Sequence, residues 1–235
     1  MHPRPIGFLA LGLILALAAA ASAQDAASND VPVVYPAGSE PQPEPSPVRW
    51  EGPVAILGAV RLDSATKTVT ATGWVNQTEG PIEVLACGPE GKVHESVFVL
   101  ALNPLDLQAA LLLAGLKGGA PMADIGQGPP NGAPVDVFVD WQEGGESKTA
   151  RAESFVWNLE EQAALPETPW TFTGSVVKDG QFKALAEESL VVTYWDPYAI
   201  VNLPLPCGAN DEILAANSNA VPPYQTPVAI RFVPR

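Results

Sequence analysis

The chain has 235 residues, of which 12 are lysine or arginine and 26 are aspartate or glutamate, so its formal net charge at pH 7 is −14. Nucleic acid and anionic lipid both attract a surplus of basic residues, so this balance argues against a nucleic-acid partner and against adsorption to anionic lipid. Only 16% of the residues are charged, and such thinly spread acidity is typical of a soluble protein.

The first 23 residues have the pattern of a signal peptide. Arg4 gives a small basic start, an apolar run extends from Ile6 to Ala21, and Ala21-Ser22-Ala23 is a small-residue cleavage motif. The run is short for a membrane helix, which needs about 20 residues, and no cysteine stands at the cleavage point to carry a lipid. We expect cleavage after Ala23, export to the periplasm or the extracellular space, and no integral membrane segment afterwards. An uncleaved signal anchor is the alternative.

Residues 24–49 are predicted to form an extended linker. Pro, Ser, Ala, Glu and Asp dominate this stretch, and its PQPEPSP segment cannot form a helix or a central strand. The folded part is predicted to span residues 50–235, which is an ordinary size for one domain.

The domain is predicted to open with β-hairpins. The β-type runs 54–62 and 66–75 are separated by a short turn and form the first hairpin. The runs 82–86 and 97–100 flank the turn sequence Gly88-Pro89-Glu90-Gly91 and form the second. The second hairpin is predicted to bring Cys87 within side-chain reach of the adjacent pair His94-Glu95.

An amphipathic helix is predicted to follow. Asn103 is a suitable N-cap and Pro104 suits the first helical position, while Gly118-Gly119 can end the helix. The apolar spacing predicts one buried stripe made of Leu105, Ala109, Leu112, Leu113 and Leu116. Leu112 is therefore expected to be buried, so that its replacement by alanine costs about 2–5 kcal/mol.

The rest of the chain reads mainly as strands. Turn signals at Gly144-Gly145 and Asp179-Gly180 indicate two further hairpins, and the predicted strands are 134–141, 147–152, 170–177, 190–195 and 226–233. Strands outnumber helices and most connections look like hairpins. The predicted fold class is therefore α+β, a single domain of mainly antiparallel β-hairpins packed with one dominant amphipathic helix.

Several segments together resemble a known family. They are IEVLACGPEGKVHESVFVL, NPLDLQAALLLAGLKGG, VDVFVDW at 135–141, PWTFTGS at 169–175 and VPPYQTPVAIRF at 221–232. From about Gly52 to Arg235 the chain resembles the YdjY-type domain of exported bacterial proteins, a family of uncertain function. The resemblance implies export but no established reaction. Some relatives are described as ferredoxin-like, but two cysteines are too few for a cluster held by four thiolates, so no cofactor is predicted.

Cys87, His94 and Glu95 are the one group that resembles a functional site. A thiol near an imidazole can act as a nucleophile, and the three side chains could ligate zinc or copper. Adjacent residues on a strand point to opposite faces, however, and no second histidine follows the leader. The alternative is a structural role in which His94 and Glu95 hydrogen-bond to loop backbone. No catalytic residue and no metal site is therefore assigned.

Three other features suggest contacts. Cys87 and Cys207 each precede a glycine, and an even pair in an exported chain suggests a disulfide; a reactive Cys87 is the alternative. Trp195 and Asp196 are the candidate ligand surface, with a packed strand end as the alternative. Trp74, Trp141 and Trp157, in or near β-type runs, are predicted to be core residues.

Two functional hypotheses follow. The first is an exported, soluble, non-catalytic module for binding or envelope assembly, with an envelope protein or a saccharide as partner, because no catalytic motif is recognisable. The second is a thiol-redox or metal-binding protein centred on Cys87 and His94. A hydrolase using carboxylates such as Glu95 and Asp196 has no paired-acid pattern to support it.

Overall fold

The computed structural model describes residues 44–235. The predicted signal peptide and most of the predicted linker therefore lie outside the described residues. Strand β1 (Arg49–Glu51) begins one residue before the predicted start of the domain. Within residues 44–235, no helix combines the length and the apolar character that crossing a membrane would require.

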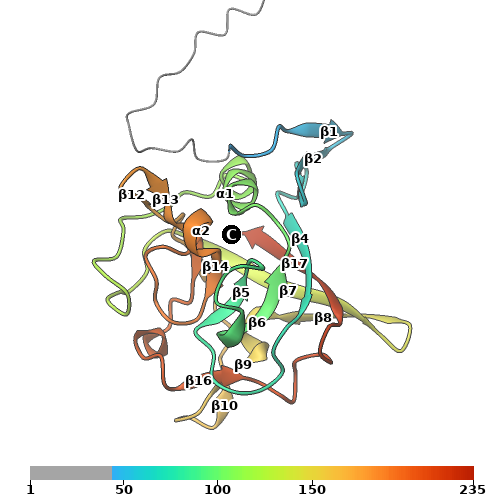
Figure 1. The fold of residues 1–235 in the computed structure, drawn as a ribbon. Helices are drawn as coiled ribbons and strands as arrows, with labels where there is room; N and C mark the ends of the chain where they lie inside the picture. Colours follow the sequence, from blue (N-terminus) through green and yellow to red (C-terminus); the bar gives the residue numbers. More distant parts are fainter. Residues whose placement is uncertain (1–43) are drawn as a thin grey trace, which may run out of the picture. The chain divides into compact units, whose positions relative to one another are not determined.

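Eight strands close into a barrel (Figure 1). Strand β6 pairs back with β4, which completes the circle. Neighbours are antiparallel except for β14 with β15 and β5 with β6, which are parallel, so the barrel is mixed. Its strands, in order around the barrel, are β4 (Val69–Val75), β17 (Pro227–Pro234), β7 (Ala133–Glu143), β11 (Trp170–Phe172), β15 (Val201–Asn202), β14 (Ser189–Val192), β5 (Val84–Cys87) and β6 (Ser96–Leu100).

The prediction of an α+β fold built from antiparallel hairpins and a dominant helix is wrong. The described residues are mostly β and contain two α-helices, α1 (Pro104–Leu113) and the short α2 (Lys183–Glu187). The predicted hairpin around Cys87 is instead the parallel pair β5–β6, joined by a loop and the 3-10 helix η1 (Val93–Glu95). Every residue of β5 and β6 is buried. Such strands show no alternation from which their direction could be read.

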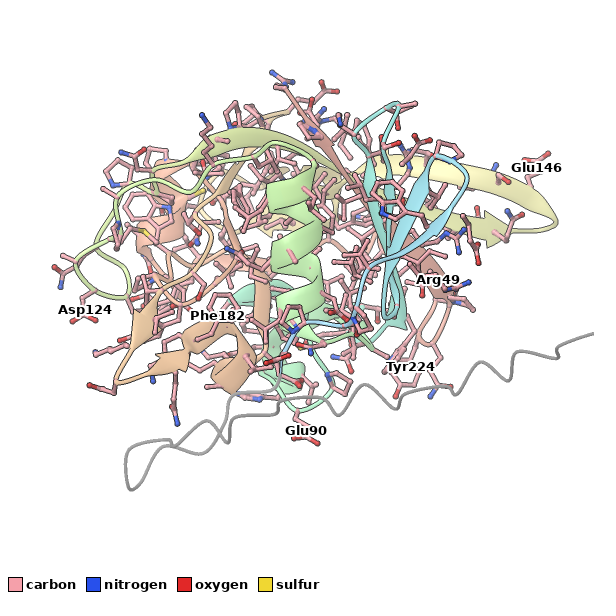
Figure 2. All side chains as sticks on the ribbon, turned by 90° about the horizontal axis from the view of Figure 1, so that it is seen from above. Arg49, Glu90, Asp124, Glu146, Phe182 and Tyr224 are labelled. Atoms are coloured by element: carbon pink, nitrogen blue, oxygen red, sulfur yellow. The ribbon has the colours of Figure 1, made fainter. Side chains whose placement is uncertain are left out.

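Strands outside the barrel extend it into a seven-strand sheet. β2 (Val54–Leu57) and β3 (Val60–Asp63) join β1 to β4, and β8 (Glu146–Arg151) pairs with β7. The predicted hairpin at Gly144-Gly145 is present, and both glycines have the positive φ that its two-residue turn needs. Figure 2 shows this hairpin projecting from the domain, with Glu146 near its tip. We call β1-β2-β3-β4-β17-β7-β8 the seven-strand sheet, and its outer face is the face turned away from the barrel interior.

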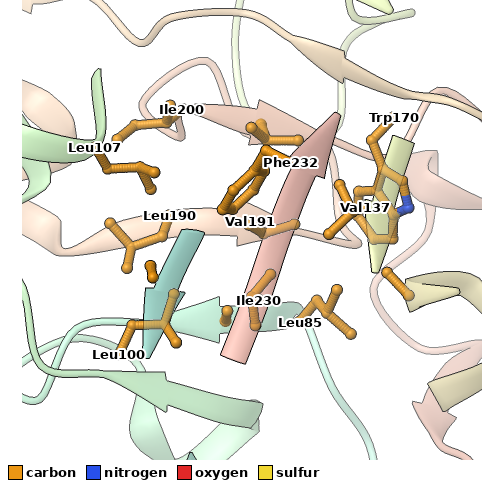
Figure 3. Close-up of a cluster of buried hydrophobic side chains, with 14 of the residues drawn as sticks. Leu85, Leu100, Leu107, Val137, Trp170, Leu190, Val191, Ile200, Ile230 and Phe232 are labelled. Atoms are coloured by element: carbon orange, nitrogen blue, oxygen red, sulfur yellow. The ribbon is translucent and has the colours of Figure 1, made fainter. Parts of the chain in front are cut away.

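The barrel interior is the hydrophobic core (Figure 3). Helix α1 lies at one end of the barrel, and a small sheet of β10, β9 and β16 lies at the other (Figure 1). The remaining elements are η2 (Ala152–Phe155), β9 (Val156–Asn158), β10 (Ala163–Ala164), β12 (Val177–Lys178), β13 (Gln181–Phe182), η3 (Pro206–Ala209) and β16 (Leu214–Ala216).

Helix α1 begins as predicted but buries a different face. The Asn103 side chain accepts a hydrogen bond from the Leu105 backbone N–H at 2.9 Å, and Pro104 occupies the first turn. Leu112 and Leu113 are half exposed, whereas the buried apolar residues include Leu107, Ala110, Leu111 and Ala114. Leucine and alanine occur on nearly every side of this helix, so the apolar spacing fits more than one face equally well.

Candidate functional site

The structure does not bring His94 and Cys87 together. In the parallel pair β5–β6, Cys87 lies opposite Val99, whereas the Glu83 backbone N–H donates to the Glu95 carbonyl at 3.2 Å. The His94-Glu95 pair is therefore level with the start of β5 and Cys87 with its end. Glu95 is still near enough for its charge to act on the Cys87 thiol, whereas the His94 side chain is exposed to solvent and Cys87 is fully buried.

Cys87 has the environment of a core residue. It is fully buried in a small cluster with Val84, Val99 and Val192 on the outer side of the barrel. Burial raises the pKa of the Cys87 thiol to about 11, and the nearby Glu188 carboxylate adds to the rise. The protonated thiol is a poor nucleophile and a poor metal ligand at neutral pH.

His94 and Glu95 lie on the surface in the 3-10 turn η1. The His94 side chain is 77% exposed, and its Nε2 lies 3.9 Å from Glu95 Oε2. Lys92 is the main partner of this region, because its Nζ contacts both Glu83 and, at 3.3 Å, Glu95. Among residues 44–235, no three His, Cys, Asp or Glu side chains are arranged so that they could hold a metal ion.

Both cysteines are free thiols. Cys87 pairs with Ser189, at the start of β14. Cys207 lies near the other end of this strand, because the carbonyl of its neighbour Gly208 accepts a hydrogen bond from the N–H of Trp195, which follows β14. The four residues of β14 span about 10 Å at about 3.3 Å per residue. Disulfides need Cα atoms within about 7 Å, so the predicted pair is not brought together.

The two thiols should therefore react differently. We expect a small uncharged thiol reagent at pH 8 to modify the partly exposed Cys207 in native protein, and to modify Cys87 only after unfolding, because Cys87 is buried and its pKa is raised. Mass spectrometry of labelled native and unfolded protein, without reductant, counts the adducts. Cys207→Ser is the control and should remain unlabelled when native. Absence of any label in unreduced, unfolded protein would instead demonstrate a disulfide.

Trp195 and Asp196 are buried and do not form a surface. The Trp195 Nε1–H donates to the Leu203 carbonyl at 2.7 Å, and Asp196 Oδ1 accepts from the Tyr198 N–H at 2.8 Å. Asn202 bonds both the backbone N–H and the backbone carbonyl of Asp196. Desolvation raises the pKa of Asp196 to about 6. Trp195 and Asp196 therefore form a packed strand end, which is the alternative to the predicted ligand surface.

A hollow of about 690 Å³ lies instead on the outer face of the seven-strand sheet. We call it the outer groove. Two neighbouring cross-strand rows line it, and the first of them is complete. The second row contains Trp74 opposite Pro227, and Gln142 opposite Ser147. The complete row contains Thr72, Ala229, Asp140 and Thr149.

Side-chain size explains the hollow. Ala229 is a small residue between the larger Thr72 and Asp140 in the complete row, so the floor of the groove is low at this point. Trp74 forms one side and is fixed because it packs against the cluster that contains Val99. The groove thus has a shallow apolar floor beside a fixed indole.

The other side of the groove is polar and ordered. Asp140 Oδ1 accepts from Thr149 Oγ1 at 2.6 Å and from Arg231 Nη2 at 3.0 Å. Although partial burial opposes it, these hydrogen bonds and the Arg231 charge lower the pKa of Asp140. Gln142 Nε2 donates to Ser147 Oγ at 2.7 Å, which fixes the amide. The groove can therefore offer aligned donors and acceptors to a neutral polar ligand.

The prediction that Trp74 is a core residue is wrong, because Trp74 is only partly buried and lines the groove on the outer face. Val69 and Ala71 are buried inside the barrel, and Trp74 has the opposite phase along β4, together with Thr70 and Thr72. This alternation indicates an outward indole. Trp141 has the inward phase and packs edge-to-face on Phe155, with ring centroids 5.9 Å apart.

Comparison with known proteins identifies the family of this domain. A search of curated proteins found no match, and neither did a search of solved structures. The family model described as the YdjY domain matches residues 60–233, which contain seven of the eight barrel strands in full and all but the last residue of β17. This match confirms the resemblance seen in the sequence, and the chain therefore belongs to the YdjY domain family.

Proposed function

We propose that this protein is an exported, non-catalytic module that binds a saccharide in the outer groove. The signal-peptide pattern of residues 1–23 supports export. The lining of the outer groove, in which the indole of Trp74 faces ordered hydroxyl, amide and carboxylate groups, supports saccharide binding. We also propose that the exported protein is associated with the cell envelope.

The chemistry of the groove suits a sugar. A sugar ring has an apolar C–H face that packs on an aromatic ring, and its hydroxyl groups need several fixed donors and acceptors. Trp74 offers the first, and Thr72, Asp140 and Gln142 offer the second. The volume of about 690 Å³ lies within the range of about 300–1,000 Å³ that is usual for small-ligand sites.

Binding is better supported than hydrolysis. A glycoside hydrolase normally needs two carboxyl groups, one of which has a raised pKa and acts as an acid. Asp140 is the one carboxylate lining the outer groove, and its pKa is lowered because it pairs with Arg231. The thiol alternative loses support as well, because Cys87 is buried with a raised pKa and lies apart from His94.

Filling the groove should abolish binding. The Ala229 side chain lies in the complete cross-strand row and points outward, so Ala229→Trp is expected to lower saccharide affinity at least tenfold without disturbing the core. A panel of neutral and acidic oligosaccharides, titrated by calorimetry, would identify the ligand. Trp50→Ala is the matched control, because Trp50 is exposed but lies outside the groove.

Two results would refute the proposal. The wild-type protein could bind no saccharide in the panel, or Ala229→Trp could bind as tightly as wild type. Gln142→Ala is a second variant that removes one polar group from the groove rim. Thermal unfolding of each variant would separate loss of binding from loss of fold.

A further inference from the structure

The arginines of the described chain are concentrated on one sheet. All five arginines of residues 44–235 lie in strands of the seven-strand sheet or directly after β17. Four of them share a single cross-strand row on its outer face, and Arg49 is visible at the edge of this sheet in Figure 2. The row runs Arg49, Ile56, Arg61, Thr70, Arg231, Phe138 and Arg151.

This arrangement makes the sheet electrostatically different from the rest of the protein. The segments 49–75, 133–151 and 227–235, which form the sheet, contain seven basic and six acidic residues. The other residues between 44 and 235 contain four basic and seventeen acidic residues. An anionic ligand is therefore repelled by most of the surface but not by this sheet.

A second hollow, of about 420 Å³, lies beside the outer groove on the same face. Arg61, Arg231 and the hydroxyl residues Thr66, Thr68 and Thr70 line it. Thr70 and Arg231 are each two residues from Thr72 and Ala229 of the outer groove, a step of about 7 Å along a strand. One ligand can therefore extend from the outer groove into this arginine hollow.

The two guanidinium groups of the hollow differ in how many contacts hold them. Arg231 is held by Asp140 through Nε and Nη2 and lies over the Phe138 ring, 5.1 Å from its centroid. The Arg61 side chain is 55% exposed, and within residues 44–235 its one ion-pair contact is with Glu51, at 3.8 Å. The carboxylate of Asp63, which also lines the hollow, accepts from the Ala65 and Thr66 N–H groups of its own turn. Arg61 is thus free to turn toward a ligand anion.

We propose that the saccharide bound in the outer groove is acidic, and that its carboxylate is held in the arginine hollow by Arg61 beside Arg231. This inference rests on the proposed function and adds the charge of the ligand. A planar guanidinium can bind a carboxylate through two parallel hydrogen bonds, which makes arginine the residue best suited to this group.

The test uses two ligands with the same sugar chain, one with charged carboxylates and one with neutral methyl esters. Trigalacturonate and its methyl ester would be titrated calorimetrically into the 24–235 protein, as wild type, Arg61→Gln and Arg49→Gln. Arg61→Gln is expected to weaken trigalacturonate about tenfold, the effect of losing one charge-assisted contact, and to leave the ester unchanged. Arg49→Gln is the matched control, because Arg49 shares the row and the partner Glu51 but does not line the hollow.

The outcomes separate this inference from the proposed function. If the ester binds, Ala229→Trp blocks it, and the acid binds no tighter, the inference fails and the proposed function stands. The inference fails likewise if Arg61→Gln and wild type bind the acid equally. If neither ligand nor any other saccharide binds wild type, the proposed function fails and this inference fails with it.

Discussion

Replacing Leu111 with alanine is expected to lower the free energy of unfolding by about 2–5 kcal/mol, the usual cost of removing a buried leucine side chain. The same change at the next residue, Leu112, is expected to alter it by less than about 0.5 kcal/mol, as is typical of surface positions. Leu111 is fully buried under the end of the barrel, whereas Leu112 is 50% exposed. Both residues lie in the last turn of α1, so the change in helix propensity is similar for the two variants.

Urea unfolding of the two variants measures the difference directly. The linear extrapolation gives the free energy of unfolding for each protein, and equal m-values would show that the same transition is compared. A loss of more than about 2 kcal/mol at Leu112, with little change at Leu111, would mean that α1 buries the stripe predicted from the sequence.

Replacing Asp196 with asparagine is expected to raise the free energy of unfolding at pH 7.5 by up to about 3 kcal/mol. Asp196 is 6% exposed, and burial, with a smaller contribution from Glu187, raises its pKa from 3.8 to about 6. A shift of about two units corresponds to about 3 kcal/mol between the two protonation states. Asparagine retains an oxygen that can accept the Tyr198 N–H without carrying a charge into this site.

The pH dependence follows from the sign of this shift. Below about pH 4 the Asp196 carboxyl group is protonated in both the folded and the unfolded protein, so it does not lower the free energy of unfolding. As the pH rises, the unfolded chain releases its proton first, so this group lowers wild-type stability between about pH 4 and pH 6. Above about pH 6 the cost is constant. The advantage of Asp196→Asn should therefore be small at pH 4 and reach its full size above pH 6.

Unfolding of wild type and Asp196→Asn across pH 4 to 8 provides the measurement. Asp136 and Asp140 also have pKa values lowered by arginine partners. Both residues are present in wild type and in the variant, so their contributions cancel when the two free energies of unfolding are subtracted. A difference that does not depend on pH, or a variant that is less stable at pH 7.5, would show that the Asp196 charge is compensated in the folded protein.

Local features of this fold are predictable from the sequence where a structural position, such as a helix N-cap or a tight turn, requires a particular type of residue. Asn103 caps α1, and Gly144-Gly145 form the turn between β7 and β8, because side-chain acceptors and positive φ angles are local requirements. The direction of β5 and β6 is not predictable in this way, since strands buried throughout lack alternation. The buried face of α1 is ambiguous for the same reason, because apolar residues surround Leu111.

The candidate site was only partly visible in the sequence. The alternation around Trp74 indicates an outward indole, but nothing in the sequence shows that β17 lies between β4 and β7. The row that joins Thr72, Ala229 and Asp140 combines residues from distant segments. Composition shows the few arginines, but only the strand order places Arg61 and Arg231 on one face.

The position of β17 has a consequence for how this protein matures. β4 and β7 do not pair with each other, and β17, from the C-terminal end of the chain, lies between them. Pairing between segments so distant in sequence is slow, because a long loop must close before any contact forms. Both hollows therefore form only when β17 is inserted between β4 and β7, because residues of β17 line each of them. Binding of the proposed saccharide would therefore report that β17 is in place and that the barrel is complete.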